Sequence, residues 1–324
     1  MTTITSRHPI KFYVTLSLLF ILGITPVFAI IFLFYSKPLE MGIILFFISA
    51  VLSIFAFSTF YDYRKNSYKV KIDKYKIWIG NRIFFHNEIK EIVLTGKRNL
   101  GSAPTESAFL LFNNGIKIIL FDKMYSNISE IKQFLEQVVL NKQEEYNPKQ
   151  INKIRRKVIR FEKEEIFKKN QFISASGILL WSFIAFFILV LLSDELNPPL
   201  INSIIAVGGW VTFMFAMFSW QMYYFGLTEK HLIIRNHNYP WMAKIYQLSD
   251  IKEVVFEHPY GTRLPDCMRV ITIDYKTKLY PAQTLRNKTW LKMKRELEKN
   301  GVKVRNECVI ENVKKIHNDK NASA

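Results

Sequence analysis

The sequence predicts an α+β membrane protein made of two similar halves, each a pair of transmembrane helices followed by a small β domain that ends in a helix. Three observations predict this class. Four long stretches carry no charge, short segments between them alternate apolar and polar residues, and a five-residue motif recurs half a chain later. The chain has 324 residues, 49% of them hydrophobic, and a net charge of +18. Because the apolar residues and the charges are segregated, an ordinary water-soluble domain is excluded.

Each uncharged stretch is long enough to cross the hydrocarbon core of a bilayer, which takes ~20 apolar residues. The first is too long for the apolar part of a secretory signal and lacks a clear small-residue cleavage site, so we expect a retained helix that is kinked or locally loosened at Pro26. In the fourth, the spanning part is expected to start near Leu200, after two prolines. The prediction is four transmembrane helices in two hairpins, within residues 12–36, 41–61, 170–193 and 196–228.

The distribution of charge predicts the orientation in the membrane. Residues 62–169 hold 23 Lys and Arg against 13 Asp and Glu, and residues 226–324 hold 19 against 11. The short links between paired spans are nearly neutral or acidic. By the positive-inside rule, both large segments and both termini are expected on the cytoplasmic side of the inner membrane. The basic charge is thus explained by anionic lipid headgroups, and no nucleic-acid partner is predicted.

The chain contains an internal repeat. The motif IKEIV at Ile89–Val93 recurs as IKEVV at Ile251–Val255, 162 residues later. The same shift carries Phe12 onto Ser174, so the starts of matching spans also coincide. Common offsets of spans and motif indicate a duplication.

Small side chains recur at matching spacing in the second and fourth spans. Small residues let transmembrane helices approach closely. We therefore predict helix packing, within or between the hairpins, at Ser49, Ser53, Ala56, Thr212, Ala216 and Ser219.

Alternating residues in the large segments predict short strands. In the first segment, Asn113-Asn114-Gly115 separates two apolar runs and predicts a tight hairpin. Periodic apolar residues after Ser129 predict a closing helix. The second segment repeats this order and ends in a helix with Trp290 facing inward. Short strands closed by one C-terminal helix suggest a curled sheet that the helix plugs.

Two stretches resemble a known family. They are YFGLTEKHLIIR at Tyr224–Arg235 and IYQLSDIKEV at Ile245–Val254, with looser counterparts at Asp73–Ile77 and Asn87–Ile92. They are similar to bacterial pleckstrin-homology-like (PH-like) domains, in which a membrane hairpin precedes a tyrosine-led strand, a threonine-acid turn and a leucine-x-aspartate-isoleucine element. The resemblance implies two tandem units of hairpin plus PH-like domain. It also implies a membrane-anchored scaffold that binds protein or lipid and has no catalytic residues.

These observations divide the chain into six segments. They are a transmembrane hairpin (1–66), a cytoplasmic PH-like domain (67–145), a basic amphipathic linker helix (146–169), a second hairpin (170–225), a second PH-like domain (226–305) and a polar tail (306–324).

The linker helix is expected to start at Asn147-Pro148 and to present an apolar stripe that includes Ile151 and Ile154. In one interpretation the stripe packs on a domain. In the favoured one the helix lies on the inner leaflet, with its basic side chains on anionic headgroups. The predicted membrane-surface residues are Lys153, Arg155, Arg156, Lys157 and Arg160.

A search for chemistry finds no catalytic, cofactor-binding or metal site. The two cysteines, Cys267 and Cys308, form neither a disulfide framework nor a paired-cysteine metal motif. His231 and His237 are imaginable as metal ligands together with His258, but exposed loop histidines are favoured. Glycine-rich phosphate loops and nucleophile elbows are missing from the sequence. The predicted spans carry no ionisable residue, which argues against an ion-coupled transporter.

The favoured function is therefore a non-enzymatic integral membrane scaffold or binding protein. Its two cytoplasmic PH-like domains are expected to bind a protein partner, to form a homo-oligomer or to organise an assembly at the inner membrane. The alternative is a membrane immunity or resistance protein that binds a toxin or peptide. A third class, an enzyme of lipid chemistry, would need a cluster of acids, histidine or serine at headgroup level, which the sequence does not offer.

Overall fold

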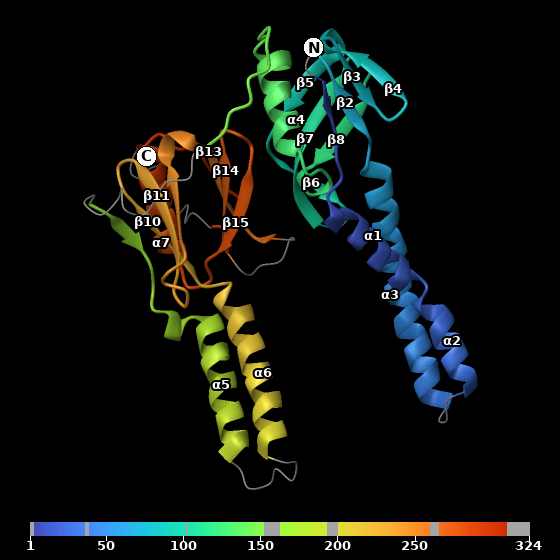
Figure 1. Cartoon of the computed structure of the whole chain (residues 1–324), viewed down its shortest axis with the longest axis vertical. Coiled ribbons are helices and arrows are strands. Elements are labelled where there is room, and N and C mark those ends of the chain that lie inside the picture. The colour runs from blue at the N-terminus through green and yellow to red at the C-terminus, as the bar shows by residue number, and fades with distance from the viewer. Residues whose placement is uncertain are drawn as a thin grey trace, which may run out of the picture. The chain divides into compact units, whose positions relative to one another are not determined.

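The computed structural model describes residues 3–35, 39–101, 103–151, 163–192, 200–259 and 266–309. The chain forms two compact units, Met1–Lys149 and Gln150–Ala324. Each unit joins a β domain to one arm of apolar helices (Figure 1). The chain is an α+β protein, and each unit is described by itself.

The β domain of the first unit contains two antiparallel sheets and a closing helix. The first sheet has the order β1-β2-β3-β4, and in the second β7 pairs with β5, β6 and β8. Helix α4 (Ile128–Phe134) continues into a π-helical segment, Leu135–Leu140, and its apolar face is buried as its periodicity predicts. The strands are β1 (Ile4–Thr5), β2 (Val70–Ile72), β3 (Lys76–Ile79), β4 (Arg82–Phe85), β5 (Ile89–Val93), β6 (Lys97–Leu100), β7 (Ala103–Phe112) and β8 (Lys117–Phe121).

The helical arm of the first unit consists of α1 (Ile10–Gly23) and α2 (Thr25–Tyr35), which pack along α3 (Leu39–Asn66) (Figure 1). The break between α1 and α2 lies just before Pro26, because proline has no N–H to donate to the carbonyl of Leu22. This confirms the kink that the sequence predicts.

The second unit has the same general build. Its sheets have the orders β12-β11-β10-β9 and β15-β14-β13-β16, and β16 runs parallel to β13. Helix α7 (Asn287–Lys299) inserts Trp290 between the sheets, where the indole lies 5.7 Å from the ring of Phe225 and 4.8 Å from that of Phe256. The strands are β9 (Glu165–Phe167), β10 (Tyr223–Leu227), β11 (His231–Asn236), β12 (Ala243–Gln247), β13 (Ile251–Glu257), β14 (Cys267–Thr272), β15 (Thr277–Pro281) and β16 (Val304–Asn306).

The repeated motif occupies the same place in both units. Strands β5 and β13 each follow one turn of 3-10 helix, and each has a register shift after its first residue. The turns are also held alike: the Asn113 N–H donates to the Glu88 carbonyl at 2.8 Å, and the Ile273 N–H donates to the Asp250 carbonyl at 2.9 Å. The two β domains therefore share the strand order of the first sheet, the bulge and the turn, and they differ at β6 of the first unit and β16 of the second.

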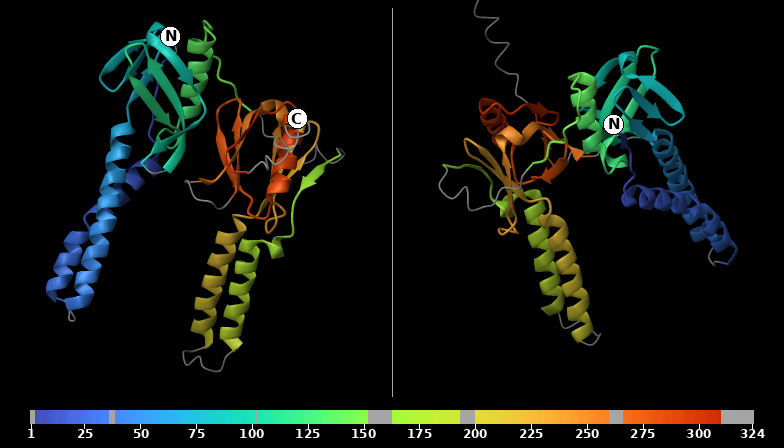
Figure 2. Two further views of the ribbon diagram at one scale, coloured as in Figure 1. Left: turned by 180° about the vertical axis from the view of Figure 1, so that it is seen from behind. Right: turned by 45° about the horizontal axis from the view of Figure 1, so that its top comes forward.

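Two helices of the described chain are long and apolar enough to cross a membrane, Ile10–Phe28 and Phe46–Asn66. Only 11% of each is buried, so they are not the core helices of the β domain. Helices α5 (Ala175–Leu192) and α6 (Leu200–Ser219) form the arm of the second unit (Figure 2).

The prediction of four transmembrane helices in two hairpins is wrong. The described apolar parts of α5 and α6, Ser176–Val190 and Val207–Ser219, fall in the range of 10–17 residues. At ~1.5 Å per residue they extend over ~15–26 Å, which is short of the ~30 Å hydrocarbon core. The fourth uncharged stretch, residues 196–228, is longer than helix α6, because its last part forms strand β10.

Each arm is inserted between two strands that pair with each other. Strand β1 precedes the first arm and pairs with β2, which follows it; β9 precedes the second arm and pairs with β10. Asn127 also stabilises the position of β1. Its side chain accepts a hydrogen bond from the Arg7 N–H and donates one to the Thr5 carbonyl, both at 2.9 Å. Both arms thus leave and re-enter a β domain at one sheet edge.

The predicted linker helix over residues 146–169 needs a correction at both ends. Residues 146–151 are not helical, although Asn147-Pro148 predicts a helix start there. Residues Glu165–Phe167 are extended and form β9, because they pair with β10. Residues 152–162 lie outside the described residues. This gap contains the five predicted membrane-surface residues, Lys153, Arg155, Arg156, Lys157 and Arg160.

Candidate functional site

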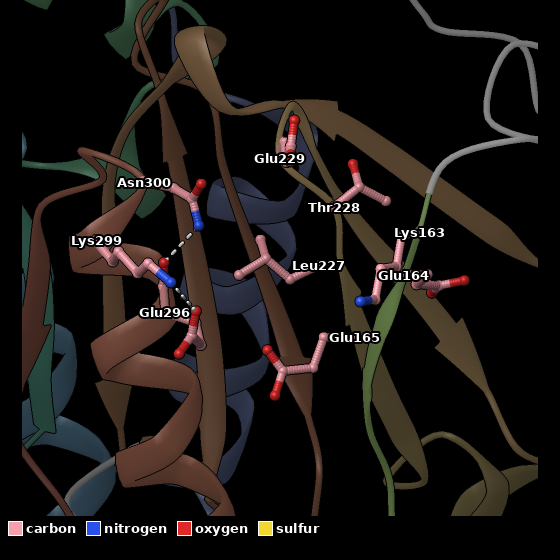
Figure 3. A pocket seen from close by; sticks show the side chains of 9 residues that line it. All are labelled: Lys163, Glu164, Glu165, Leu227, Thr228, Glu229, Glu296, Lys299 and Asn300. Carbon is pink, nitrogen blue, oxygen red and sulfur yellow. Dashed lines mark hydrogen bonds and ion pairs between the residues drawn. The ribbon is translucent and has the colours of Figure 1, made fainter.

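A pocket of about 670 Å³ opens in the second unit (Figure 3). It lies between β9, the turn from β10 to β11, and the C-terminal end of α7. Three separate parts of the sequence line it: Lys163, Glu164 and Glu165; Leu227, Thr228 and Glu229; and Glu296, Lys299 and Asn300.

Thr228 shapes the turn at one wall of the pocket. Its buried hydroxyl accepts hydrogen bonds from the backbone N–H of His231 at 2.9 Å and of Lys230 at 3.3 Å. A threonine hydroxyl that binds the backbone in this way stabilises a tight turn. The threonine-acid pair of the sequence therefore places the Glu229 side chain on the rim, where it is exposed.

Glu164 is held at the opposite wall by Arg235 of β11. The Arg235 guanidinium donates two hydrogen bonds to the carboxylate, one of them over 3.0 Å to Oε2. This pairing raises the pKa of Arg235. The carboxylate lies over Gly226, where a Cβ would come within 1.6 Å of Oε1. A side chain at position 226 would therefore displace the Glu164 carboxylate from this position.

The other lining carboxylates are also paired, with one exception. Glu165 Oε1 lies 2.5 Å from Lys292 Nζ, and Glu296 Oε2 lies 3.7 Å from Lys299 Nζ. Glu229 has no ion pair among the described residues. Because the C-terminal end of a helix carries negative partial charge, the end of α7 adds to the field of Glu229. These two features make the Glu229 side of the pocket acidic, whereas Lys163 brings a positive charge to the wall at β9.

Strand β9 borders the pocket and is an edge strand. In the described part of the chain it has one neighbour, β10, so its outer N–H and C=O groups face away from the sheet. The central residue of β9, Ile166, exposes 48% of its surface. An extended peptide could add to such an edge by backbone hydrogen bonds.

The groups that line the pocket are carboxylates, ammonium groups, an amide, a hydroxyl and a leucine side chain. Its nine lining residues include no histidine, cysteine or serine. The one hydroxyl, that of Thr228, is used by the backbone. The sequence alone does not predict this pocket, because its walls come from three segments that lie far apart along the chain. Among the lining residues, Leu227–Glu229 carry a sequence signal, because they belong to the stretch that resembles PH-like domains.

The small residues predicted for helix packing behave differently in the two arms. Ser53 and Ala56 are buried within the first arm, and Ser49 bonds to the Phe46 carbonyl of its own helix. In the second arm, Thr212 and Ala216 are exposed.

Ser219 is buried, but it contacts the β domain and not a helix. Its carbonyl accepts from the Asn236 amide at 2.7 Å, and its hydroxyl accepts from the Asn238 amide at 2.6 Å. Within the second arm, the three residues of this stripe therefore do not share one helix interface.

The three histidines considered as metal ligands are not gathered into one site. His231 is buried in β11, contrary to the expectation of an exposed loop residue. His237 packs against Tyr224, with ring centroids 4.7 Å apart and ring planes tilted by 43°; burial followed by the charge of Lys168 lowers the pKa of His237 to about 4. His258 lies instead beside Asp266, with Nδ1 3.2 Å from Oδ1.

Comparison with known proteins does not assign the chain to a family. No protein-family model matches it, and no curated protein does.

Proposed function

We propose that the chain is a non-enzymatic, membrane-anchored binding protein. Its β domains hold a protein partner next to the cytoplasmic face of the inner membrane. The single observation that carries this proposal is the pairing of β1 with β2 around the first helical arm. It makes the arm and the domain one continuous structure, so the domain stays at the membrane surface.

The first arm has the surface expected of a membrane anchor. Large apolar side chains point outward along it; Ile54 is 73% exposed and Val51 67%. Exposing such a surface to water would be unfavourable, at ~25 cal/mol per Å² of apolar area. The N-terminal segment is also part of the folded β domain through β1, which supports a retained anchor over a cleaved signal.

Charge supports the cytoplasmic placement. Two spans return the chain to the side on which it began, so the N-terminus and everything after α3 share one side. That side carries the net +10 of residues 62–169, and it is therefore the cytoplasmic one by the positive-inside rule.

The pocket and the edge of β9 supply the binding site. We envisage an extended segment of the partner that adds to β9 through its backbone and places a lysine or arginine beside Glu229. The resemblance to PH-like domains supports a binding role, since that family implies protein or lipid binding and no catalysis. Fold analogy alone does not establish function, so the test must address these residues.

The topology is tested by cysteine labelling of intact cells, in a chain whose two native cysteines are replaced. We expect Lys37→Cys, in the link between the two spans, to react with an impermeant maleimide. Asn113→Cys, in the turn after β7, is expected to react only after the membrane is opened. Labelling of Asn113→Cys from outside would disprove the orientation.

The binding site is tested by a photo-crosslinking amino acid placed at Ile166 or at Glu229, in native membranes. Both positions should yield an adduct with the same protein. Lys278, an exposed residue of β15 in the other sheet, is the matched control and should not. Glu229→Lys should weaken the Ile166 adduct, whereas Lys278→Glu should leave it unchanged. Equal adducts at all three positions would refute a specific site.

A further inference from the structure

One end of the second sheet of the second unit gathers three potential metal ligands. Glu257 of β13 pairs with Cys267 of β14, so the next residue on β13, His258, stands opposite Asp266. On the other side of β13, Phe256 pairs with Asn306 of the parallel strand β16. Continuing that register by two residues brings Cys308 beside His258. Aspartate, histidine and cysteine therefore lie in one row across three neighbouring strands.

The side chains of this row converge. The imidazole, carboxylate and thiol ligand atoms of His258, Asp266 and Cys308 all lie within 4.8 Å of one another. His258 Nδ1 and Asp266 Oδ1 are 3.2 Å apart. The Nδ1 atom is buried, yet it is outside hydrogen-bond geometry with any described group. A buried ring nitrogen without a hydrogen bond is uncommon, and a metal ion held between Nδ1 and the facing carboxylate would satisfy it.

The donor set matches a borderline transition metal better than it matches an ordinary ion pair. Zn²⁺ takes imidazole nitrogen, thiolate sulfur and carboxylate oxygen at ~2.0–2.3 Å in a tetrahedral arrangement, which separates ligand atoms by ~3.5 Å. The observed spacing requires the side chains to close by about 1 Å, which rotation about their χ angles supplies. An ion pair alone uses His258 and Asp266, and the Cys308 thiol, which also packs against the hydrophobic core, adds the sulfur ligand that such a metal prefers.

Nearby charges do not oppose a cation at this place. Arg269 is paired with the buried carboxylate of Glu257 at 2.6 Å, and Arg305 is paired with Glu307 at 2.9 Å. Burial raises the pKa of the Asp266 carboxyl, and the facing imidazole lowers it by less. A bound dication would favour the ionised carboxylate.

We propose that His258, Asp266 and Cys308 form a binding site for Zn²⁺ or a divalent ion of similar chemistry. Three protein ligands leave a fourth tetrahedral position for water or for a ligand from a partner. On binding, the S–H bond of Cys308 is replaced by a bond from sulfur to the metal, and the proton leaves to solvent. No oxidation or reduction takes place. The site lies apart from the pocket at β9 and does not depend on the proposed function.

The test uses the full chain, purified metal-free in detergent, with Co²⁺ as a spectroscopic probe. A thiolate–cobalt charge-transfer band should appear with a stoichiometry of one and should disappear when Zn²⁺ is added. Cys308→Ser should abolish the band. His258→Gln and Asp266→Asn should weaken Zn²⁺ binding by at least ~10–100-fold in a competition titration, given that even the outer partners of metal ligands have effects of that size.

Cys267→Ala is the matched control, because Cys267 is the neighbouring residue and the second cysteine of the chain. Burial raises the pKa of its thiol, which makes it a poor ligand. The Cys267→Ala variant should keep the band. A band that survives Cys308→Ser, or no band at saturating Co²⁺ in wild-type protein whose circular dichroism shows it folded, would overturn the proposal.

Discussion

The hydroxyl of Ser53 on α3 donates a hydrogen bond of 2.5 Å to the carbonyl of Gly23, at the break between α1 and α2. Pro26 removes the N–H that would otherwise bind the Leu22 carbonyl, and Thr25 Oγ1 donates to that oxygen at 2.8 Å. Two side-chain hydroxyls therefore satisfy carbonyls at the kink. In a hydrocarbon environment, water is not available to do so.

The first prediction concerns this hydrogen bond. Ser53→Ala should destabilise the first arm by about 1 kcal/mol, because it leaves the Gly23 carbonyl without its donor in an apolar setting. Ser49→Ala is the matched control; its hydroxyl binds only the Phe46 carbonyl of its own helix, so little change is expected. Unfolding of both variants in mixed micelles with increasing SDS measures the difference. Equal effects would show that the bond across the helices contributes nothing specific.

The second prediction concerns the close approach at Gly23. A Cβ at this position would lie 2.9 Å from the Phe57 ring, so Gly23→Ala must push α1 and α3 apart or turn the ring. We expect a loss of about 1–3 kcal/mol from overpacking. Gly208→Ala in α6 is the control, because no atom lies within 4 Å of the added Cβ. The same SDS titration applies, and a stable Gly23→Ala variant would contradict the tight packing.

The third prediction concerns a buried ion pair in the first unit. Lys132 of α4 is 1% exposed and lies 2.6 Å from the carboxylate of Asp122. Lys132→Met leaves that carboxylate without its cation and should cost about 3–5 kcal/mol. The double variant Lys132→Met with Asp122→Asn should recover a large part of the loss. Hydrogen exchange of peptides from 103–121 reports on this unit alone; no recovery in the double variant would argue against charge as the cause.

The fourth prediction concerns pH. Burial, helped by Lys168, lowers the pKa of His237 from 6.5 to about 4 in the folded state. Between these values the unfolded chain binds the proton first, so stability is complete above pH 6.5 and falls as the pH drops toward 4. Burial also lowers the pKa of His86 in the first unit, which adds a loss of the same sign.

Denaturant titrations across this pH range measure the effect. His237→Gln should flatten the decline in the second unit and leave that in the first, whereas His86→Gln should do the reverse. An unchanged pH dependence in the second unit of His237→Gln would show that another group causes the decline.

Patterns of neighbouring residues predict correctly those features that depend on neighbouring residues, such as turns. The Asn-Gly turn at Gly115 joins β7 to β8, and Gly115 has the positive φ of 81° that such a turn needs. At the matching turn of the second unit, Tyr275 takes a positive φ of 59°. Its ring is buried and its hydroxyl accepts a hydrogen bond from Lys252 at 2.5 Å. These contacts stabilise a left-handed backbone conformation that a tyrosine in the sequence does not predict.

The sequence by itself determined the uncharged stretches, the repeat at Ile89 and Ile251, and the closing helices, because each is a pattern of neighbouring residues. Only the tertiary structure decided the rest. Strands as short as β1 and β9 carry no periodicity, and they exist because a partner strand lies beside them. The pocket at Glu229 and the row of His258, Asp266 and Cys308 depend on strand register, which joins residues that are far apart along the chain. Whether an apolar helix is long enough to span a membrane likewise depends on the residue at which the next strand begins, and the hydropathy of the sequence does not predict that residue.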